Sequence, residues 1–138
     1  MIMDGCLFCK IINNEISAEK IYEDENVLAF LDINPINVGH TLVIPKNHSD
    51  SLLDTPIEDW LSVSEVAYRL APKIKDAVDA DGINIGMNIG APAGQVIFHT
   101  HLHIMPRFSG DGYKLWKGTP YKDEQEIQTV ADRIRSKI

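Results

Sequence analysis

Residues 95–105 read Gln95-Val96-Ile97-Phe98-His99-Thr100-His101-Leu102-His103-Ile104-Met105, and this stretch decides the expected fold and chemistry. Three of the five histidines in the chain alternate here with Thr100, Leu102 and Ile104. Side chains on a strand return to the same face every second residue. We therefore expect the three histidines to share one face of a strand, while the residues between them pack into the core.

The spacing of the histidines also divides their roles. Alternate residues lie about 6.5–7 Å apart along a strand, so His99 and His103 are expected about 13 Å apart, too far to touch one atom. His101 can share a ligand with His103, which leaves His99 for another role. An imidazole with an ordinary pKa of about 6.5 supplies a neutral nucleophile, and a neighbouring one can donate a proton or a hydrogen bond to a phosphate or leaving group.

This pattern favours phosphoryl chemistry, and two other interpretations stay open. The histidines can be the outward polar positions of a solvent-facing strand. Alternatively, all three, including His101, can bind a metal ion.

The rest of the chain predicts an α+β fold, in which helices flank a mostly antiparallel sheet. Strands are expected over residues 27–33, 40–45, 83–89 and 96–105, and helices over residues 55–81 and 124–138, with a helical turn and loop near residues 11–16. The first long helix is expected to begin with Thr55 as its N-cap and Pro56 in its first turn. Pro72 is expected to kink or divide this helix near Leu70. We expect residues 1–138 to form a single domain.

Composition limits the partners that the protein can have. The chain has 138 residues and a formal net charge of −7, and its basic residues are dispersed, which argues against a nucleic-acid-binding module. It has no apolar run of membrane-spanning length and no signal-peptide pattern at its start, so we expect no membrane association and a cytoplasmic location. A local pocket rich in hydrogen-bond donors can still bind a small phosphate ligand.

The two cysteines form a Cys-x-x-Cys pair, Cys6 and Cys9. A secreted domain held together by disulfides usually has more cysteines, whereas in a cytosolic chain this spacing indicates metal binding or redox chemistry. Two alternatives are a pair of small buried hydrophobic side chains and a thioredoxin-type redox pair, although the strand–helix setting of the latter is missing.

These motifs together resemble the histidine triad (HIT) family, whose signature is His-φ-His-φ-His-φ-φ, where φ is apolar. The signature corresponds to residues 99–105, with Thr100 as the one imperfect match. Residues 6–12, 29–35 and 39–48 also match in order and spacing, and the cysteine pair is typical of the small bacterial and archaeal branch. The resemblance implies a HIT-like fold, a nucleotide ligand and a homodimer, with Trp116 near the site of the partner chain.

The resemblance implies a two-step reaction at the α-phosphate of a nucleotide. His101 attacks the phosphorus and expels the leaving group with the help of His103, and water then hydrolyses the nucleotidyl-histidine. A backbone carbonyl orients the ring of the nucleophile, and His40 supports the active strand. The implied substrate contacts are Phe30, Asp32, Ile33, Asn88, Gln95 and His103, with Ile11 as a further contact to the base.

Each nucleoside contact also has a structural alternative. Phe30, Ile33 and Ile11 can be ordinary core residues, and Asp32 can bond to nearby backbone at the start of a turn.

The cysteine-bearing relatives imply a structural Zn²⁺ site, in which His48 and His99 complete the pair Cys6 and Cys9. Four such ligands are typical of a closed tetrahedral zinc site that stabilises the fold. We expect no organic cofactor.

The function expected from this resemblance is hydrolysis of purine nucleoside phosphoramidates or related nucleotidyl compounds. His103 favours hydrolysis, because the nucleotidyltransferase branch of the family lacks the third histidine. Many relatives have Ser or Thr at the position of Val96, which removes one hydroxyl donor from this chain. The alternatives are a dinucleoside polyphosphate hydrolase, a nucleotide-binding scaffold or signalling dimer with low turnover, and a simple zinc-binding protein.

Overall fold

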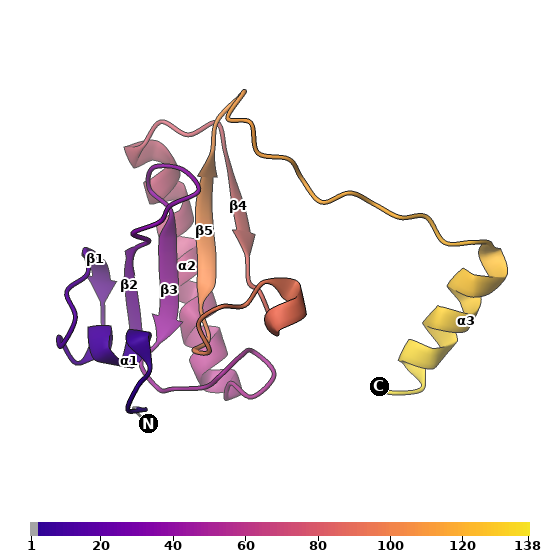
Figure 1. Ribbon diagram of the computed structural model, residues 1–138, viewed down its shortest axis with the longest axis horizontal. Coiled ribbons are helices and arrows are strands. Elements are labelled where there is room, and N and C mark those ends of the chain that lie inside the picture. Colours follow the sequence, from indigo (N-terminus) through magenta and orange to yellow (C-terminus); the bar gives the residue numbers. More distant parts are fainter. Residues whose placement is uncertain (1–2) are drawn as a thin grey trace.

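The computed structural model describes residues 3–138, and its centre is one antiparallel sheet with the strand order β1-β2-β3-β5-β4 (Figure 1). The strands are β1 (Lys20–Glu23), β2 (Val27–Leu31), β3 (Thr41–Pro45), β4 (Gly82–Gly86) and β5 (Leu102–Arg107). The helices are α1 (Leu7–Ile12), α2 (Ile57–Ala77) and α3 (Glu124–Arg135), with a 3₁₀ turn η1 at Ala91–Ala93. The predicted α+β class with an antiparallel sheet is confirmed.

Alternation along the strands separates two apolar layers. Figure 1 shows α2 behind the sheet, and the buried side chains on that face are Val27, Ala29, Val43, Leu102 and Ile104 together with Val63, Val66, Ala67 and Ile74 of α2. The opposite face carries Leu28, Phe30, Leu42 and Ile44, which pack against Phe8 and Ile11 of α1. Because Leu102 and Ile104 point toward α2, the side chain of His103 points to the α1 side of the sheet.

The strand that carries the histidines is shorter at its start than predicted. A strand was expected over residues 96–105, but β5 begins at Leu102 and continues through Pro106 to Arg107. Its pairing with β3 ends where Val43 faces Leu102, and β3 itself ends at Pro45, which has no N–H to donate. His99 and His101 therefore lie in an irregular segment that precedes the strand, and the expectation that all three histidines share one face of a strand is wrong for these two.

The start of α2 also differs from the prediction. The helix begins after Pro56, and no side chain caps it. The Thr55 hydroxyl donates to the Ser51 carbonyl at 2.7 Å instead, so the expected Thr55 N-cap is wrong. The helix runs without a break through Pro72, so of the two predicted effects, a kink or a division near Leu70, the division does not occur. One missing donor is tolerated here because Val66, Ala67 and Ile74 hold the helix against the sheet.

Other elements have boundaries that the sequence pattern did not give. The strand β1 was not predicted. The first helix, α1, spans Leu7–Ile12 and so begins earlier than the helical turn expected near residues 11–16. The strand expected over residues 27–33 ends at Leu31, the one expected over 83–89 ends at Gly86, and the C-terminal helix ends at Arg135. The expected long-looped hairpin is confirmed, because β2 and β3 pair in antiparallel register.

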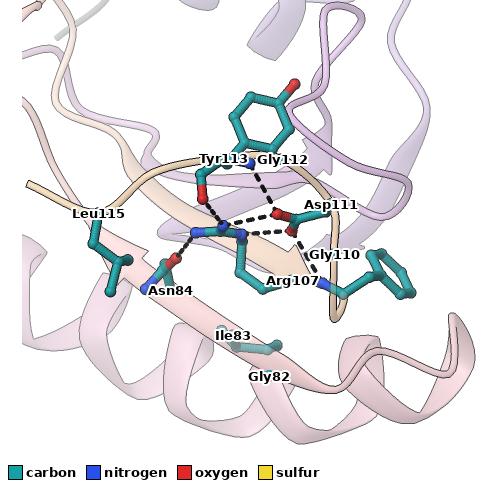
Figure 2. Close-up of a pocket in the computed structure, with 10 residues that line it drawn as sticks. Gly82, Ile83, Asn84, Arg107, Gly110, Asp111, Gly112, Tyr113 and Leu115 are labelled. Atoms are coloured by element: carbon teal, nitrogen blue, oxygen red, sulfur yellow. Dashed lines mark hydrogen bonds and ion pairs between the residues drawn. The ribbon is translucent and has the colours of Figure 1, made fainter.

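The chain leaves the sheet through a tight turn after β5. Asp111 accepts from Nε and Nη2 of Arg107 at 2.8 and 2.9 Å, and Arg107 also donates to Asn84 of β4 (Figure 2). Beyond this turn, residues 113–123 run away from the sheet to α3, which Figure 1 shows apart from it. No helix among the described residues has the length and apolar character needed to cross a membrane.

Candidate active site

The ring of His101 is fixed by a hydrogen bond to its own chain. Nδ1 of His101 lies 2.6 Å from the carbonyl oxygen of His99, which can only accept, so Nδ1 carries the proton. In the neutral ring, Nε2 is then the nitrogen with the free lone pair. The residue is 7% exposed, and its ring lies 4.9 Å from the ring of His103, centroid to centroid. The structure therefore brings His101 and His103 together in adjacent positions.

A directed chain of hydrogen bonds fixes the tautomer of His103. The backbone N–H of Ile36 donates to Nδ1 of His40 at 3.1 Å, so a neutral His40 has its proton on Nε2. Nε2 of His40 lies 2.8 Å from Nδ1 of His103 and donates to it. His103 must then have its proton on Nε2, a buried atom that has no hydrogen-bond partner in the described part of the chain. His40 thus acts directly on His103, a closer role than the general support expected from the sequence.

Burial keeps these rings neutral at neutral pH. Burial, together with the neighbouring rings of His101 and His40, lowers the pKa of His103 to about 4. Burial is also the main cause that lowers the pKa values of His40 and His101. The carboxylate of Asp32 opposes these shifts, and it lies 3.8 Å from Nε2 of His40. An uncharged ring with a free lone pair is the form that a nucleophile needs.

The predicted nucleoside contacts fall into two groups. Phe30 and Ile11 are buried in the apolar layer beneath α1, so the core interpretation describes their packing. Ile33 is 86% exposed at the end of β2. One carboxylate oxygen of Asp32 accepts from the backbone N–H of Asn34 at 2.8 Å, so the alternative role of Asp32, a bond to nearby backbone, is present. Its second oxygen faces His40.

The two predicted phosphate contacts, Asn88 and Gln95, have different surroundings. Asn88 lines a cavity of about 310 Å³ together with His40, His103 and Trp116. Gln95 is buried and bridges two loops: it donates to the carbonyls of Asp50 and Ile97 and accepts from the N–H of Gly90. Its amide thus holds the loop before the histidines in place, while that of Asn88 donates only to the carbonyl of Gly94, at 3.3 Å.

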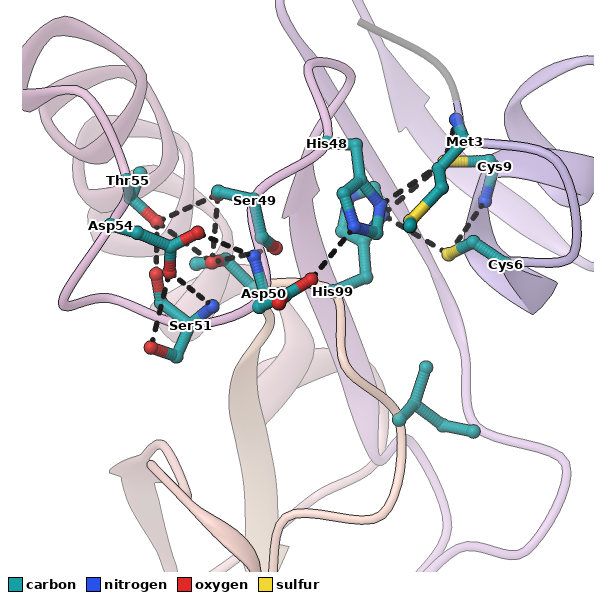
Figure 3. A network of polar contacts seen from close by, with 12 residues as sticks. Met3, Cys6, Cys9, His48, Ser49, Asp50, Ser51, Asp54, Thr55 and His99 are labelled. Carbon is teal, nitrogen blue, oxygen red and sulfur yellow. Dashed lines mark hydrogen bonds and ion pairs between the residues drawn. The ribbon is translucent and has the colours of Figure 1, made fainter.

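The remaining four predicted residues converge at the start of α1. The Sγ atoms of Cys6 and Cys9 and the Nδ1 atoms of His48 and His99 all lie within 4.8 Å of one another (Figure 3). Nδ1 of His99 lies 3.5 and 3.6 Å from the two sulfurs, and the two Nδ1 atoms are 3.2 Å apart. We call these four residues the Cys/His cluster.

The donor set of the Cys/His cluster suits a zinc ion. Nε2 of His99 donates to the Pro45 carbonyl and Nε2 of His48 to the Asp50 carboxylate, so in neutral rings both Nδ1 lone pairs point into the cluster. In a tetrahedral zinc site the ligand atoms are separated by about 3.3 Å for two nitrogens and about 3.6 Å for sulfur and nitrogen. The observed separations are close to these values, and burial holds the pKa of His99 at about 4, which keeps its lone pair available.

Three contributors to the site were not predicted from the sequence. Phe8 meets the rings of both His99 and His101 edge-on, although its only visible signal was its place between the two cysteines. Asp50 orients His48, and its position two residues later was a usable signal. The carbonyl of Pro45 could not be identified from the sequence, because every residue has a backbone carbonyl.

The chain is similar to several known proteins. The model of the HIT domain family matches residues 13–110. A HIT-like protein of Borreliella burgdorferi is 48% identical over 126 residues, which cover 90% of this chain and 91% of that protein. The adenylylsulfatase HINT3 of Arabidopsis thaliana is 43% identical over 110 residues, 80% of this chain and 56% of that one.

Several solved structures are similar to this chain in both sequence and fold. A protein of Streptococcus mutans superposes with a TM-score of 0.93 at 38% identity, covering 98% of this chain and 86% of that one. A zinc-bound histidine triad protein of Mycobacterium smegmatis has a TM-score of 0.76 at 39% identity, with 97% and 98% covered. A HIT family hydrolase of Clostridium thermocellum has a TM-score of 0.70 at 32% identity, with 83% and 99% covered.

The lowered pKa of His103 predicts an acid-sensitive fold. The unfolded chain binds a proton below about pH 6.5 and the folded ring only below about pH 4, so stability is retained above this window and lost as the pH falls through it. We expect the free energy of unfolding to fall by about 1–2 kcal/mol more in the wild type than in His103→Gln, a value reduced for the partial solvation of the ring. Urea unfolding at several pH values measures this, and equal slopes for both proteins would contradict it.

Proposed function

This chain belongs to the HIT domain family, and we propose that it is a hydrolase that cleaves nucleotidyl compounds at the α-phosphate through His101. The substrates that we favour are purine nucleoside phosphoramidates. The likeness to a HIT family hydrolase supports the reaction type, and the name of the adenylylsulfatase relative supports an adenylyl group as the part that is recognised.

The observation that carries this proposal is the unpaired Nε2–H of His103 beside the free lone pair of His101. A buried donor without a partner costs free energy, so its retention indicates a ligand that accepts from it. The hydrogen bonds through His40 and to the His99 carbonyl make one ring a donor and the other a nucleophile. A phosphate group between them would use both atoms at once.

The proposed reaction has two steps. Nε2 of His101 attacks the α-phosphorus while the bond to the leaving nitrogen or oxygen breaks. The Nε2–H of His103 donates to a phosphate oxygen or to the leaving atom, which stabilises the charge that develops there. A water molecule then attacks the phosphorus and breaks its bond to His101. The proton that this water loses balances the one taken up by the leaving atom, so the second step releases the nucleoside monophosphate and restores the neutral ring.

The two sides of His103 accommodate different parts of the substrate in this proposal. Asp32 would bond to the ribose hydroxyls, with Phe30 and Ile33 beside the base, while the cavity that holds Asn88 would receive the leaving group. Val96, which directly follows Gln95, is 79% exposed and offers no hydroxyl. This feature favours a second candidate, a nucleotide-binding dimer with low turnover, and a dinucleoside polyphosphate is the alternative substrate.

We also propose that the Cys/His cluster binds one structural zinc ion. Cys6, Cys9, His48 and His99 would be its ligands, and Asp50 and the Pro45 carbonyl would orient the two rings. The zinc-bound relative supports this assignment. Bound there, zinc would supply a closed link between α1 and the sheet, and so stabilise the fold.

A homodimer is the third part of the proposal, and the C-terminal segment supports it. No residue of α3 is buried, and its apolar stripe, which includes Ile127 and Ile134, is exposed. A twelve-residue helix is only marginally stable without packing. Trp116, on the way to α3, is 98% exposed. The Streptococcus mutans structure covers 98% of the chain, which includes most of this segment, so its extended course favours a fixed contact with a second copy.

The first test measures release of AMP from adenosine 5′-phosphoramidate by the wild type and by His101→Ala. We expect kcat to fall by about 10³-fold or more, because the nucleophile is lost, while the affinity for AMP is retained. The far-ultraviolet circular dichroism of both proteins serves as the control for folding. Equal loss of turnover and affinity would make His101 a structural residue, and binding without turnover in the wild type would favour the low-turnover dimer.

The zinc proposal predicts one ion per chain in the protein as purified. Cys9→Ser should lose the ion and unfold at a lower temperature, because a ligand and its contribution to folding are removed. Asp50→Asn keeps all four ligands and should only weaken the affinity, by about 10- to 100-fold. Metal analysis and thermal unfolding measure both effects. More than one zinc per chain, with loss in His103→Ala, would instead indicate that the triad itself binds metal.

The dimer proposal predicts that charge on the apolar stripe of α3 separates the two copies. Ile127→Glu combined with Ile134→Glu should shift sedimentation from dimer to monomer, because buried carboxylates are costly. Gln125→Glu combined with Thr129→Glu adds the same charge to the opposite face of α3 and should remain dimeric. A wild type that sediments as a monomer, or the same mass for both variants, would contradict the proposal.

A further inference from the structure

We propose that the Cys/His cluster also positions the nucleophile, and that Phe8 and the His99 carbonyl carry its arrangement to the ring of His101. This inference rests on the proposed role of His101 as the nucleophile. Two groups in direct contact with that ring belong to the immediate surroundings of the cluster. One is the carbonyl of a cluster residue, and the other is the side chain that lies between the two cysteines in the sequence.

The carbonyl of His99 lies outside the sheet. The ladder of β5 begins at Leu102, so no strand pairing holds the peptide group between His99 and Thr100. The ring of His99 anchors this segment instead, with Nε2 donating to the Pro45 carbonyl at 2.8 Å and Nδ1 among the cluster atoms. The orientation of His101 therefore depends on where the cluster holds the neighbouring ring.

A backbone hydrogen bond and two hydroxyl contacts hold the same peptide group. The backbone N–H of Thr100 donates to the Ser49 carbonyl at 2.8 Å, and its hydroxyl lies 2.9 Å from that of Ser49 and 2.7 Å from that of Thr55. Ser49 directly follows His48, so this anchor is also linked to the cluster. The segment is thus fixed at two points, by the ring of His99 and by the contacts of Thr100, and both points adjoin residues of the cluster.

Phe8 provides the second connection. It is buried, and its ring meets His101 edge-on at 5.2 Å and His99 at 5.8 Å between centroids. It lies in α1, whose only side-chain cap is the Cys6 sulfur, which accepts from the N–H of Cys9 at 3.5 Å. A helix of six residues has little stability of its own, so closing the cluster fixes the helix and with it the ring of Phe8.

If the four residues of the cluster lose their arrangement, we expect the ring of His101 to remain in the site without its fixed orientation. His101 would lose the single orientation in which Nδ1 donates to His99 and Nε2 faces the phosphate. A displacement of about 1 Å at a reacting group can cost about 100-fold in rate. Asp32 follows β2, which is held by its full ladder with β3, so nucleotide affinity should change little. The effect should therefore appear in kcat and not in binding.

The first test compares the zinc-loaded full chain with the same chain after chelation. Nuclear magnetic resonance of ¹⁵N-histidine-labelled protein reports the tautomer of each ring. With the cluster closed, His101 should show a single tautomer with a slowly exchanging Nδ1–H. After chelation, this signal should broaden or mix with the other tautomer, and single-turnover AMP release should slow by about 10- to 100-fold with unchanged AMP affinity.

The second test leaves the four ligands intact. Phe8→Leu should keep its zinc, lower kcat and mix the tautomers of His101, because the edge contacts of the Phe8 ring with His101, His99 and Phe30 are lost while the four ligands remain. Ile44→Val is the matched control, since Ile44 is buried in the same apolar layer and makes none of these ring contacts. It should keep both kcat and the single tautomer.

The outcomes separate this inference from the proposed function. Full turnover and a single His101 tautomer in Phe8→Leu would overturn the positioning role even if His101→Ala is inactive. A wild type that releases no AMP would contradict the proposed function, while the tautomer signals would still report on the coupling. If chelation unfolds the chain, Phe8→Leu alone decides the question.

Discussion

The hydrogen bond from Nδ1 of His101 to the His99 carbonyl determines what the rest of the site can do. It selects the tautomer, so the lone pair of Nε2 faces outward and the ring needs no proton acceptor to become a nucleophile. It also links two residues with different roles, since the backbone of His99 orients the ring of the proposed nucleophile while its own ring joins the Cys/His cluster. The arrangement requires alternate spacing of the histidines and an acceptor that is held still.

A second, independent set of contacts makes the neighbouring ring a donor. The backbone N–H of Ile36, in the loop between β2 and β3, fixes His40, and His40 fixes His103. The first donor in this series of hydrogen bonds is a backbone amide, which does not change its protonation. The donor and acceptor of each following hydrogen bond are therefore fixed. The loop between two strands thus contributes to the site without placing a side chain in it.

The sequence was most informative where a pattern of residue types has one structural solution. Alternation predicted that His103 lies opposite the core residues Leu102 and Ile104, and the cysteine pair with His48 and His99 does converge. The start of β5 was not predictable, because it depends on the missing N–H of Pro45 in another strand. The roles of Gln95 and Phe8 were equally hidden, since both depend on which loops and rings meet in three dimensions.

The electrostatics of the site explain how an acidic chain can accommodate an anionic ligand. The net charge of −7 opposes the approach of a phosphate. Protonated imidazoles would attract the phosphate, but a protonated ring has no free lone pair and cannot act as a nucleophile. Burial settles the conflict by lowering the pKa values of His40, His101 and His103, so that the rings act as neutral dipoles with fixed directions. In the proposed reaction, charge developing on a phosphate would then be met by oriented donors, which need no rearrangement at the moment of reaction. Such a reaction would depend on the placement of each ring, and for this reason contacts outside the proposed phosphate site, at α1 and the Cys/His cluster, would bear on its chemistry.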